Sequence, residues 1–248
     1  MVAREAGSPM YGRRADLYDR IYDAKDYAGE VRRLRGLVRR LGPRSARDWL
    51  DVACGTGRHL AELRRDFRVV GVDRSPAMLR LARRRLPGVR LVRSDMRRLA
   101  LRDRFDVVSC LFSSIGYLRT ERDLRAALRA FARHLRPGGL LLVEPWLAPD
   151  ELRRGHVGVN VYRDAQIAIV RFGVVRRRGD LSYLDLEYLI GIEHRGVRHV
   201  TETEVLRLTP RSRWPELLRD AGLRPLAAAP IRREHGRALV LARAPGGR

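Results

Sequence analysis

The sequence predicts an α/β fold, namely a doubly wound, mostly parallel sheet that carries a small inserted antiparallel β module. Within residues 47–147 short apolar strands alternate with helical stretches, a rhythm typical of a parallel sheet with helices on both faces. A glycine-bearing turn follows the first strand. After Pro149 successive strands are joined by turns, which predicts the inserted module at residues 148–208. Residues 47–147 and 209–248 are therefore assigned to one domain.

The N-terminal segment, residues 1–46, precedes this domain. Apolar residues recur at helical spacing toward its end, and arginines fill the opposite side. One or two helices are expected over residues 18–41, ended by Gly42 and Pro43.

The main domain is expected to open with five strands, at residues 48–52, 68–73, 89–93, 105–110 and 139–144. The longest helix between them is expected over residues 120–135. Glu121 and Asp123 favour its first turn, and the run R-P-G-G at residues 136–139 stops it.

The inserted module is expected to contain strands at residues 157–162, 166–175, 181–193 and 198–208. Apolar and polar residues alternate over residues 184–189, as in a sheet with one face in water. A helix at residues 210–221 and strands at 223–230 and 237–242 then complete the main domain.

The turn after the first strand carries the strongest functional signal. Gly55 and Gly57 lack a Cβ, so a ligand can approach the backbone closely, and the helix behind them presents unpaired N–H groups. Asp73 ends the next strand, where a carboxylate can bind both hydroxyls of a ribose. A ligand containing a nucleoside is the first hypothesis.

The details of the motif exclude the common nucleotide folds. A dinucleotide site requires G-x-G-x-x-G, but Leu60 stands where the third glycine belongs, and no Walker lysine is present. The pattern that fits is an acid ending each of the first two strands (Asp51 and Asp73), A-C-G-T-G at residues 53–57, and an acid after the third strand (Asp95). This ordered set is the pattern of an S-adenosylmethionine (SAM) site.

At these residues the chain resembles the class I SAM-dependent methyltransferases. Within that class it is most similar to the N,N-dimethyltransferases of nucleotide-linked amino sugars, of the desosamine and mycaminose type. The runs that carry this resemblance are Y-D-R-I-Y at 18–22, K-D-Y-A at 25–28, F-S-S-I-G-Y at 112–117 and V-E-P-W at 143–146.

The resemblance implies a seven-stranded Rossmann-like methyltransferase sheet, an N-terminal segment closing over the cofactor, and an inserted module that serves the substrate or a dimer. It also implies in-line transfer of a methyl group from SAM to the amine of an anionic nucleotide sugar, in antibiotic biosynthesis. A homodimer is a further expectation from the resemblance.

The same resemblance assigns individual residues to the cofactor. Asp51, Ala53 and Gly55 would border its methionine part, Asp73 would bind the ribose, and Asp95 and Met96 the adenine. Met78 would pack against the ring, although an ordinary core contact explains it equally well. The remaining cofactor positions are Tyr22, Tyr27, Arg74 and Leu111.

Tyr22, Tyr117 and Glu144 are the candidate catalytic residues. Tyr22 and Tyr27 would close over the methionyl part and the reacting amine, Tyr117 would lie beside the methyl group, and Glu144 would accept a hydrogen bond near the amine or serve a turn. The substrate positions are Ser113, Ser114, Trp146, Arg177 and Arg237. The two serines have the alternative of satisfying the backbone of a turn, and the arginines suit a diphosphate.

The formal charge of +23 comes from 52 Lys and Arg against 29 Asp and Glu. Lys25 is the only lysine, as expected of a GC-rich coding sequence, and the arginines are scattered over helix faces. We read these as solvated faces, which favour anionic substrates in general; an anionic partner remains the alternative.

Three other functions stand beside the leading hypothesis: a methyltransferase of another small molecule, an RNA methyltransferase that uses the arginine surface, and a SAM-binding protein without catalysis. Nucleic acid is disfavoured because the fourth strand lacks the signature of base amino methylation. No metal-ligand spacing, secretory signal or membrane span is evident, and Cys54 and Cys110 are expected to be reduced. These features favour a cytoplasmic enzyme without membrane contact.

Overall fold

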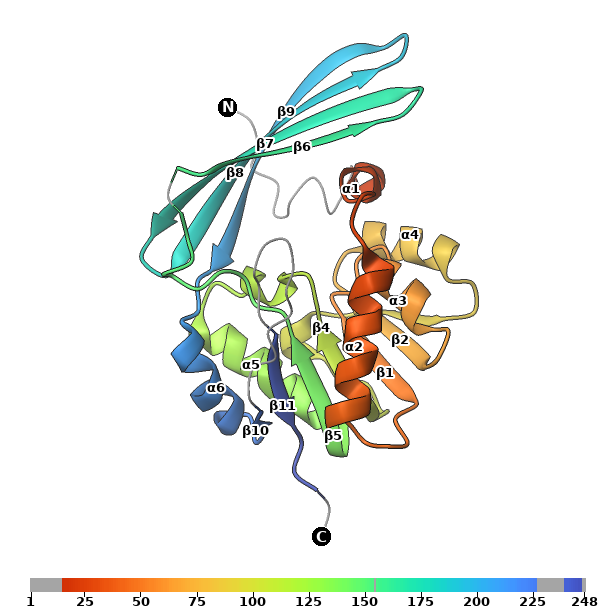
Figure 1. The fold of residues 1–248 in the computed structure, drawn as a ribbon, viewed down its shortest axis with the longest axis vertical. Coiled ribbons are helices and arrows are strands. Elements are labelled where there is room, and N and C mark those ends of the chain that lie inside the picture. The colour runs from red at the N-terminus through yellow and green to blue at the C-terminus, as the bar shows by residue number, and fades with distance from the viewer. Residues whose placement is uncertain (1–14, 154, 227–238, 247–248) are drawn as a thin grey trace.

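The structure, a computed structural model, describes residues 15–153, 155–226 and 239–246. Its larger sheet has seven strands in the order β10-β11-β5-β4-β1-β2-β3 (Figure 1). The strands are β1 (Asp48–Val52), β2 (Arg68–Asp73), β3 (Arg90–Arg93), β4 (Phe105–Cys110), β5 (Leu135–Val143), β10 (Arg224–Pro225) and β11 (Val240–Arg243). Strands β1 to β5 pair in parallel, and β11 is antiparallel to both β5 and β10. The predicted doubly wound, mostly parallel sheet is confirmed.

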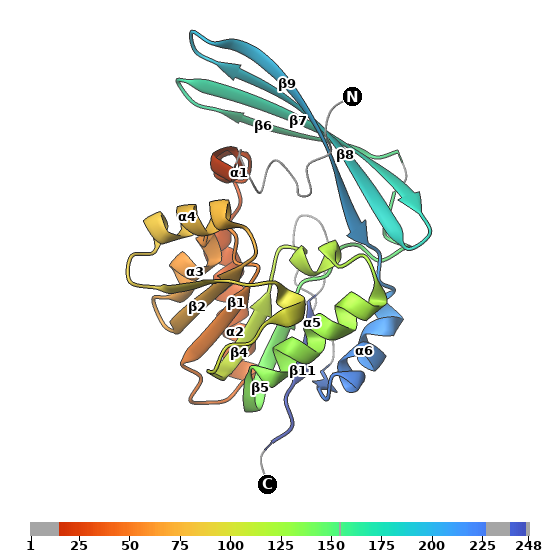
Figure 2. The same cartoon turned by 180° about the vertical axis from the view of Figure 1, so that it is seen from behind.

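Helices cover both faces of this sheet (Figures 1 and 2). One face packs against α2 (Tyr27–Leu41), α3 (Arg58–Leu63) and α4 (Pro76–Arg85), and the other against α5 (Glu121–Arg133) and α6 (Trp214–Asp220). Successive strand residues alternate between the two cores, as a pleated strand requires. The central strands β1 and β4 are thus buried on both sides, whereas the edge strand β3 is only partly covered.

The boundaries around α5 differ from the predicted ones. The helix ends at Arg133 and β5 already begins at Leu135, four residues before the predicted strand. His134 makes the junction: its Nδ1 lies 2.6 Å from the Ala130 carbonyl oxygen, and its Nε2 accepts the Leu101 N–H at 2.8 Å. The buried His134 ring, which has a polar contact at each ring nitrogen, therefore ends the helix, and no glycine is needed there.

The C-terminal part is shorter than predicted where the structure describes it. The helix expected over residues 210–221 is a 3-10 turn (Arg211–Arg213) followed by α6. Of the two final strands, β10 and β11 cover two and four residues. The remainder of both predicted strands falls mainly in residues 227–238, outside the described residues.

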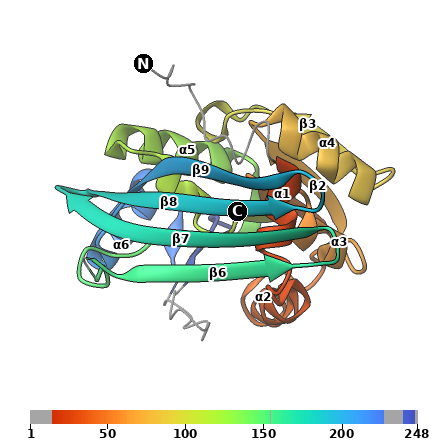
Figure 3. The same ribbon diagram turned by 90° about the horizontal axis from the view of Figure 1, so that it is seen from above.

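A second sheet lies across one end of the first (Figure 3). Its four antiparallel strands are β6 (Val157–Arg163), β7 (Ile167–Arg178), β8 (Leu181–Ile192) and β9 (Gly196–Arg207), in that order. The predicted antiparallel sheet is confirmed. Its inner face buries an apolar cluster against α1 (Ala15–Ile21), the first described helix.

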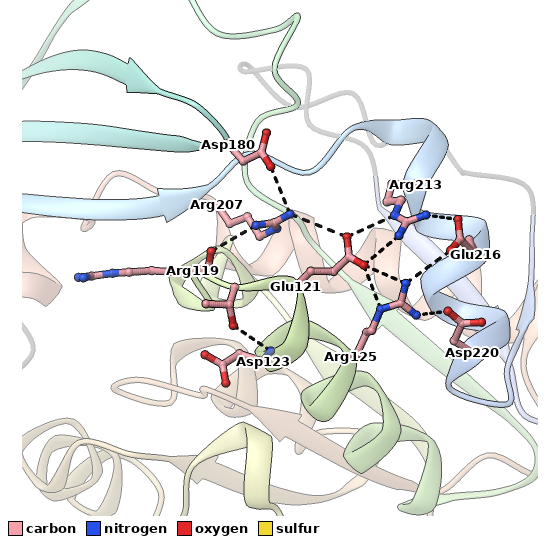
Figure 4. Close-up of polar contacts among 10 residues, drawn as sticks. Arg119, Glu121, Asp123, Arg125, Asp180, Arg207, Arg213, Glu216 and Asp220 are labelled. Carbon is pink, nitrogen blue, oxygen red and sulfur yellow. Dashed lines mark hydrogen bonds and ion pairs between the residues drawn. The ribbon is translucent and has the colours of Figure 1, made fainter.

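An arginine–carboxylate network joins the second sheet to the first domain (Figure 4). Glu121, in the first turn of α5, binds Arg125 at 2.9 Å, Arg213 at 2.9 Å and Arg207 at 3.9 Å. Hydrogen bonds from Arg213 and Arg125 lower the pKa of Glu121 to about 2. Arg207 ends β9 and also meets Asp180 in the turn before β8. Arg125, Arg207 and Arg213 therefore form ion pairs within the protein.

Replacing Gly71 by valine is expected to destabilise the fold by about 2 kcal/mol, as core overpacking commonly does. Gly71 lies in β2, and an added Cβ would come within 2.6 Å of Leu60 and of Leu91 and within 2.9 Å of Cys54 Sγ. Urea unfolding measures the effect. The matched control is Gly36→Ala in α2, where an added Cβ meets nothing within 4 Å and helix propensity improves. Equal midpoints for the two variants would contradict the packing described here.

Both cysteines are buried free thiols. Within the described residues, no helix has the length and apolar character to cross a bilayer. The described part of the chain also contains no group of three or more His, Cys, Asp or Glu side chains that could hold a metal ion.

Candidate active site

Residues of the predicted cofactor site lie at the carboxyl ends of the parallel strands. Strands β1 and β4 are neighbours, yet the chain leaves β1 toward β2 and leaves β4 toward β5. Such a reversal of strand order is where doubly wound sheets bind ligands. Asp51 and Asp73 lie at these strand ends: Asp51 is the last residue but one of β1, and Asp73 is the last residue of β2.

Asp51 is almost completely buried and is oriented by a chain of hydrogen bonds. The Trp49 indole donates to Ser109 Oγ at 2.8 Å, and the Ser109 hydroxyl donates to Asp51 Oδ1 at 2.6 Å. Burial raises the pKa of Asp51 to about 7, because the hydrogen bond from Ser109 offsets only part of the desolvation and the charge of Asp73 adds to it. The carboxyl group therefore titrates near neutral pH.

The turn between β1 and α3 contains two glycines, Gly55 and Gly57, whose surroundings differ. At Gly57 (φ 78°) an added Cβ would lie 2.6 Å from Leu86 Cδ1, so the fold itself requires glycine there. At Gly55 (φ 56°) it would meet nothing within 4 Å. The backbone at Gly55 therefore faces open space at the carboxyl ends of the strands. This open turn forms a cradle that a ligand can approach closely. Ala53 also has a positive φ, 59°.

Asp73 closes this cradle. Its Oδ2 accepts the Gly55 N–H at 2.9 Å and its Oδ1 accepts the Ser75 N–H at 2.8 Å. Burial raises the pKa of Asp73, and these backbone hydrogen bonds oppose the rise. Each oxygen has a further lone pair, so the carboxylate can still accept two hydroxyl groups. The residues present fit the ribose of an adenosyl ligand.

The turn after β4 is backbone-strained and held by two side chains. Phe112 and Ser113 have φ values of 52° and 62°, in the left-handed region that non-glycine residues seldom occupy. Buried Glu144 accepts the Phe112 N–H at 2.7 Å, and the Ser113 hydroxyl donates to the Pro145 carbonyl at 3.1 Å. Glu144 thus has a structural partner, and its catalytic role stays a prediction. Strain of this kind persists where the surrounding structure enforces it, often at functional sites.

Two tyrosines of the N-terminal segment reach the same region. The Tyr22 ring meets Phe112 edge-on at 4.9 Å between centroids. Tyr27, the first residue of α2, is buried against His59 at 4.9 Å. Burial raises the pKa of Tyr27, so its hydroxyl stays protonated. The structure therefore brings both predicted tyrosines near the glycine turn or the Phe112 turn.

Arg171, on β7 of the second sheet, was not identified from the sequence. Its Nη1 donates to the Tyr22 hydroxyl oxygen at 2.7 Å, and its guanidinium lies 5.1 Å from the centre of that ring. Because arginine can only donate, the Tyr22 oxygen accepts and its proton points elsewhere. The second sheet thereby helps to orient a candidate catalytic residue.

Arg171→Met is expected to lower kcat/KM about tenfold, since one hydrogen bond to a charged donor contributes about 1.5 kcal/mol or more. Methionine keeps an apolar stem against the ring and removes the donor. Initial-rate assays with SAM measure the effect. Arg176→Met is the matched control, because Arg176 lies on the same strand and pairs with Asp185 in solvent. If both variants kept full kcat/KM, Tyr22 would not depend on Arg171.

The remaining predicted cofactor residues lie around the ends of β2, β3 and β4. Asp95 caps a short 3-10 turn and pairs with Arg97 at 2.6 Å, which lowers the pKa of Asp95. Met78 and Leu111 are buried in the core, Met96 is partly buried, and Arg74 is exposed after Asp73. Their cofactor roles stay predictions.

The predicted substrate residues do not all gather at one point. Trp146 donates its indole N–H to Ser182 on β8 at 2.8 Å, which links the two sheets. Arg177, at the far end of β7, donates to the carbonyls of Gly179 and Pro149. Ser114 and Tyr117 begin and end the 3-10 turn after Ser113. Arg237 lies outside the described residues.

Two polar clusters that attach the N-terminal segment were missed. Asp19 of α1 accepts hydrogen bonds from Thr56 at 2.6 Å, Arg58 at 3.2 Å and Arg85 at 2.6 Å. The second cluster contains Lys25, Glu30 and His59. The available signal was that Asp19 and Lys25 belong to two of the four runs that carry the resemblance.

A methyltransferase domain matches residues 50–139. The dTDP-3-amino-3,6-dideoxy-alpha-D-glucopyranose N,N-dimethyltransferase of Streptomyces fradiae is 39% identical over 215 residues, which cover 86% of this chain and 84% of that protein. The dTDP-4-amino-2,3,4,6-tetradeoxy-D-glucose N,N-dimethyltransferase of Saccharopolyspora spinosa is 39% identical over 213 residues, 85% of each.

A solved structure extends the similarity to nearly the whole chain. The SAM-bound amino pentose methyltransferase of Micromonospora echinaspora, involved in calicheamicin biosynthesis, superposes with a TM-score of 0.83 at 32% identity and covers 98% of both chains. The similarity therefore includes the glycine turn, the N-terminal segment and the second sheet.

Proposed function

The chain belongs to the SAM-dependent methyltransferases, among the N,N-dimethyltransferases of nucleotide-linked amino sugars, and on this premise we propose that its methyl acceptor is the amine of a nucleotide-linked deoxy amino sugar. The two sugar-modifying relatives act on dTDP sugars with an amine at position 3 or 4. The observation that carries the donor side is the pairing of Gly55 with Asp73 at the carboxyl ends of β1 and β2: the Gly55 backbone faces open space, and its N–H binds the Asp73 carboxylate.

The reaction needs orientation more than a dedicated base. SAM supplies a methyl group on a sulfonium: the amine lone pair forms the N–C bond while the C–S bond breaks and its electrons stay on sulfur. Alignment alone lowers such barriers by about 7–11 kcal/mol. The amine loses its proton to water before attack. Tyr22, Tyr117 and the Phe112 turn are proposed to form the wall that fixes the acceptor and keeps water out.

We also propose that the second sheet is the substrate module. Trp146 and Arg171 connect it to the rim, so an acceptor bound beneath it would meet the donor at the carboxyl ends of β1 and β4. The positive charge of the chain favours an anionic diphosphate there. The boundaries of this module are proposed as residues 148–208.

Labelled SAM and an acceptor panel test the function. The panel contains dTDP-3-amino and dTDP-4-amino sugars, the same sugars without the nucleotide, and tRNA. We expect label only in a nucleotide-linked member, and the product mass shows whether one or two methyl groups are added. Label in a free sugar would remove the nucleotide from the proposal, and label in tRNA would replace it with an RNA acceptor.

We propose a homodimer that forms through the outer face of the second sheet. The edge strand β6 exposes Val157 (55%), Val159 (54%) and Val161 (69%), and the neighbouring β7 exposes Phe172. An apolar edge strand of this kind is a favourable pairing surface. Light scattering should give twice the chain mass for the wild type and a single chain mass for Val161→Asp. A monomeric wild type at micromolar concentration would contradict this proposal.

A cytoplasmic enzyme of antibiotic biosynthesis is the corresponding biological proposal. The buried free thiols suit a reducing compartment, and one structural relative acts in calicheamicin biosynthesis. Cell fractionation of the producing organism tests the location.

A further inference from the structure

Lys25 is the single lysine of the chain. Lys and Arg together number 52, so all the remaining basic positions hold arginine. Lysine and arginine differ in shape: lysine presents a compact charge with three donors, and arginine a broad planar fork. The one position that keeps lysine lies beside the proposed donor site. This combination of composition and place carries the inference.

The Lys25 ammonium is surrounded by groups from separate parts of the fold. It forms an ion pair with Glu30 of α2, and its Nζ lies 3.5 Å from His59 Nε2 of α3. It also lies 4.1 Å from the ring centre of Tyr27 and 4.8 Å from that of Phe112. The side chain is only 13% exposed.

These neighbours come from three segments near the carboxyl ends of the parallel strands. Tyr27 and Glu30 belong to the N-terminal segment, His59 to the helix behind the glycine turn, and Phe112 to the strained turn after β4. His59 Nε2 also lies 2.8 Å from Glu30 Oε2, so the cluster is closed on itself. The ammonium is enclosed by two rings, a carboxylate and an imidazole, so the broader guanidinium of an arginine would have to displace at least one of these groups.

We propose that Lys25 is a positioning residue of the methyl transfer, whose ammonium holds Tyr27 and the Phe112 turn in the arrangement that closes the N-terminal segment over the donor. The inference rests on the proposed function. Phe112 in turn contacts the ring of Tyr22, so displacement of the ammonium would disturb both tyrosines. Misplacement of about 1 Å near the reacting atoms can cost a hundredfold in rate.

Lys25→Met and Lys25→Arg test the requirement for an ammonium. In both variants we expect kcat to fall at least about tenfold while the acceptor KM changes by less than about threefold. Recovery of kcat by Lys25→Arg to within twofold would overturn the claim, because a charge alone would then be enough. Unchanged kcat in Lys25→Met would overturn it directly.

Arg20→Met is the matched control. Arg20 is also a cation of the N-terminal segment, with a carboxylate partner (Asp164, 2.8 Å) and a ring neighbour (Tyr162, 5.9 Å). Its side chain is 37% exposed and its contacts lie away from the glycine turn. We expect full activity for this variant. A loss equal to that of Lys25→Met would show that any weakening of the segment has the same effect, and would overturn the special role of Lys25.

The single lysine also allows a test on the wild-type fold. Growth on lysine labelled with carbon-13 at Cε gives one labelled side chain in the whole protein. Ring currents from Tyr27 and Phe112 should move its proton signal upfield of free lysine, and Phe112→Leu should remove part of that shift. Addition of S-adenosylhomocysteine should move the signal again, because the cluster borders the donor site.

The outcomes separate this inference from the proposed function. Wild-type protein that gives no calorimetric heat with S-adenosylhomocysteine would overturn the function and the inference together. Protein that binds this ligand while the lysine signal stays at the free-lysine position would overturn the role of Lys25 alone. A shifted, ligand-sensitive signal with the kcat losses above would support it.

Discussion

Asp73→Ala is expected to weaken the binding of S-adenosylhomocysteine at least about a hundredfold. A carboxylate that accepts two ribose hydroxyls contributes two charge-assisted hydrogen bonds of about 1.5–3 kcal/mol each, and a loss of about 3 kcal/mol corresponds to that factor. The variant also leaves the Gly55 and Ser75 N–H groups without their acceptor, which loosens the cradle itself. Isothermal calorimetry measures the affinity.

A matched control separates the ligand effect from the structural one. Asp106 is also buried and also accepts two backbone N–H groups, from Arg47 at 2.8 Å and from Asp48 at 2.9 Å. It lies near the start of the central strand β4, at the amino ends of the parallel strands and therefore at the opposite end from Asp73. Asp106→Ala should reduce the unfolding free energy by a similar amount and leave the affinity of the folded protein unchanged. Equal losses of affinity would refute the ribose assignment of Asp73.

The fold could be predicted from the sequence because its signals are local. Alternation in β1 places Trp49 in one core and Leu50 in the other, and this pattern is already visible in the chain. The start of β5 could not be predicted in the same way. The run R-P-G-G resembles a stop signal, yet Leu135 pairs with Phe105 before the register shifts. Only the neighbouring strand shows that the segment is already extended.

The same distinction between local signals and contacts with distant elements applies to the candidate site. The positions of Asp51, Gly55 and Asp73 in the fold were predictable because a strand end and a glycine turn fix them, while their cofactor roles stay predictions. Arg171 and His59 were not, because each acquires its role from an element that is distant in the sequence. A lone arginine among many, or a histidine without a ligand partner at regular spacing, has no signature of its own until the fold brings Tyr22 or Glu30 beside it.

The affinity for S-adenosylhomocysteine is expected to fall about tenfold when the pH is lowered from about 8 to about 6. The pKa of Asp51 in the folded protein is raised to about 7 from its usual value of 3.8, chiefly by burial. The resemblance implies that the methionine part of the ligand, which carries an ammonium group, would border this carboxyl group. An ammonium favours the carboxylate, so the complex forms with proton release, and acid opposes binding through the pH range around 7.

The stability of the ligand-free protein should have the opposite pH dependence, and this contrast makes the assignment testable. Because burial raises the pKa of Asp51, the folded state holds a proton that the unfolded state releases between about pH 4 and about pH 7, so this residue destabilises the fold as the pH rises through 7. Thermal unfolding and calorimetry at the same pH values measure the two trends. Asp51→Asn should flatten both, whereas affinity that still falls in acid in Asp51→Asn would assign the titration to another group.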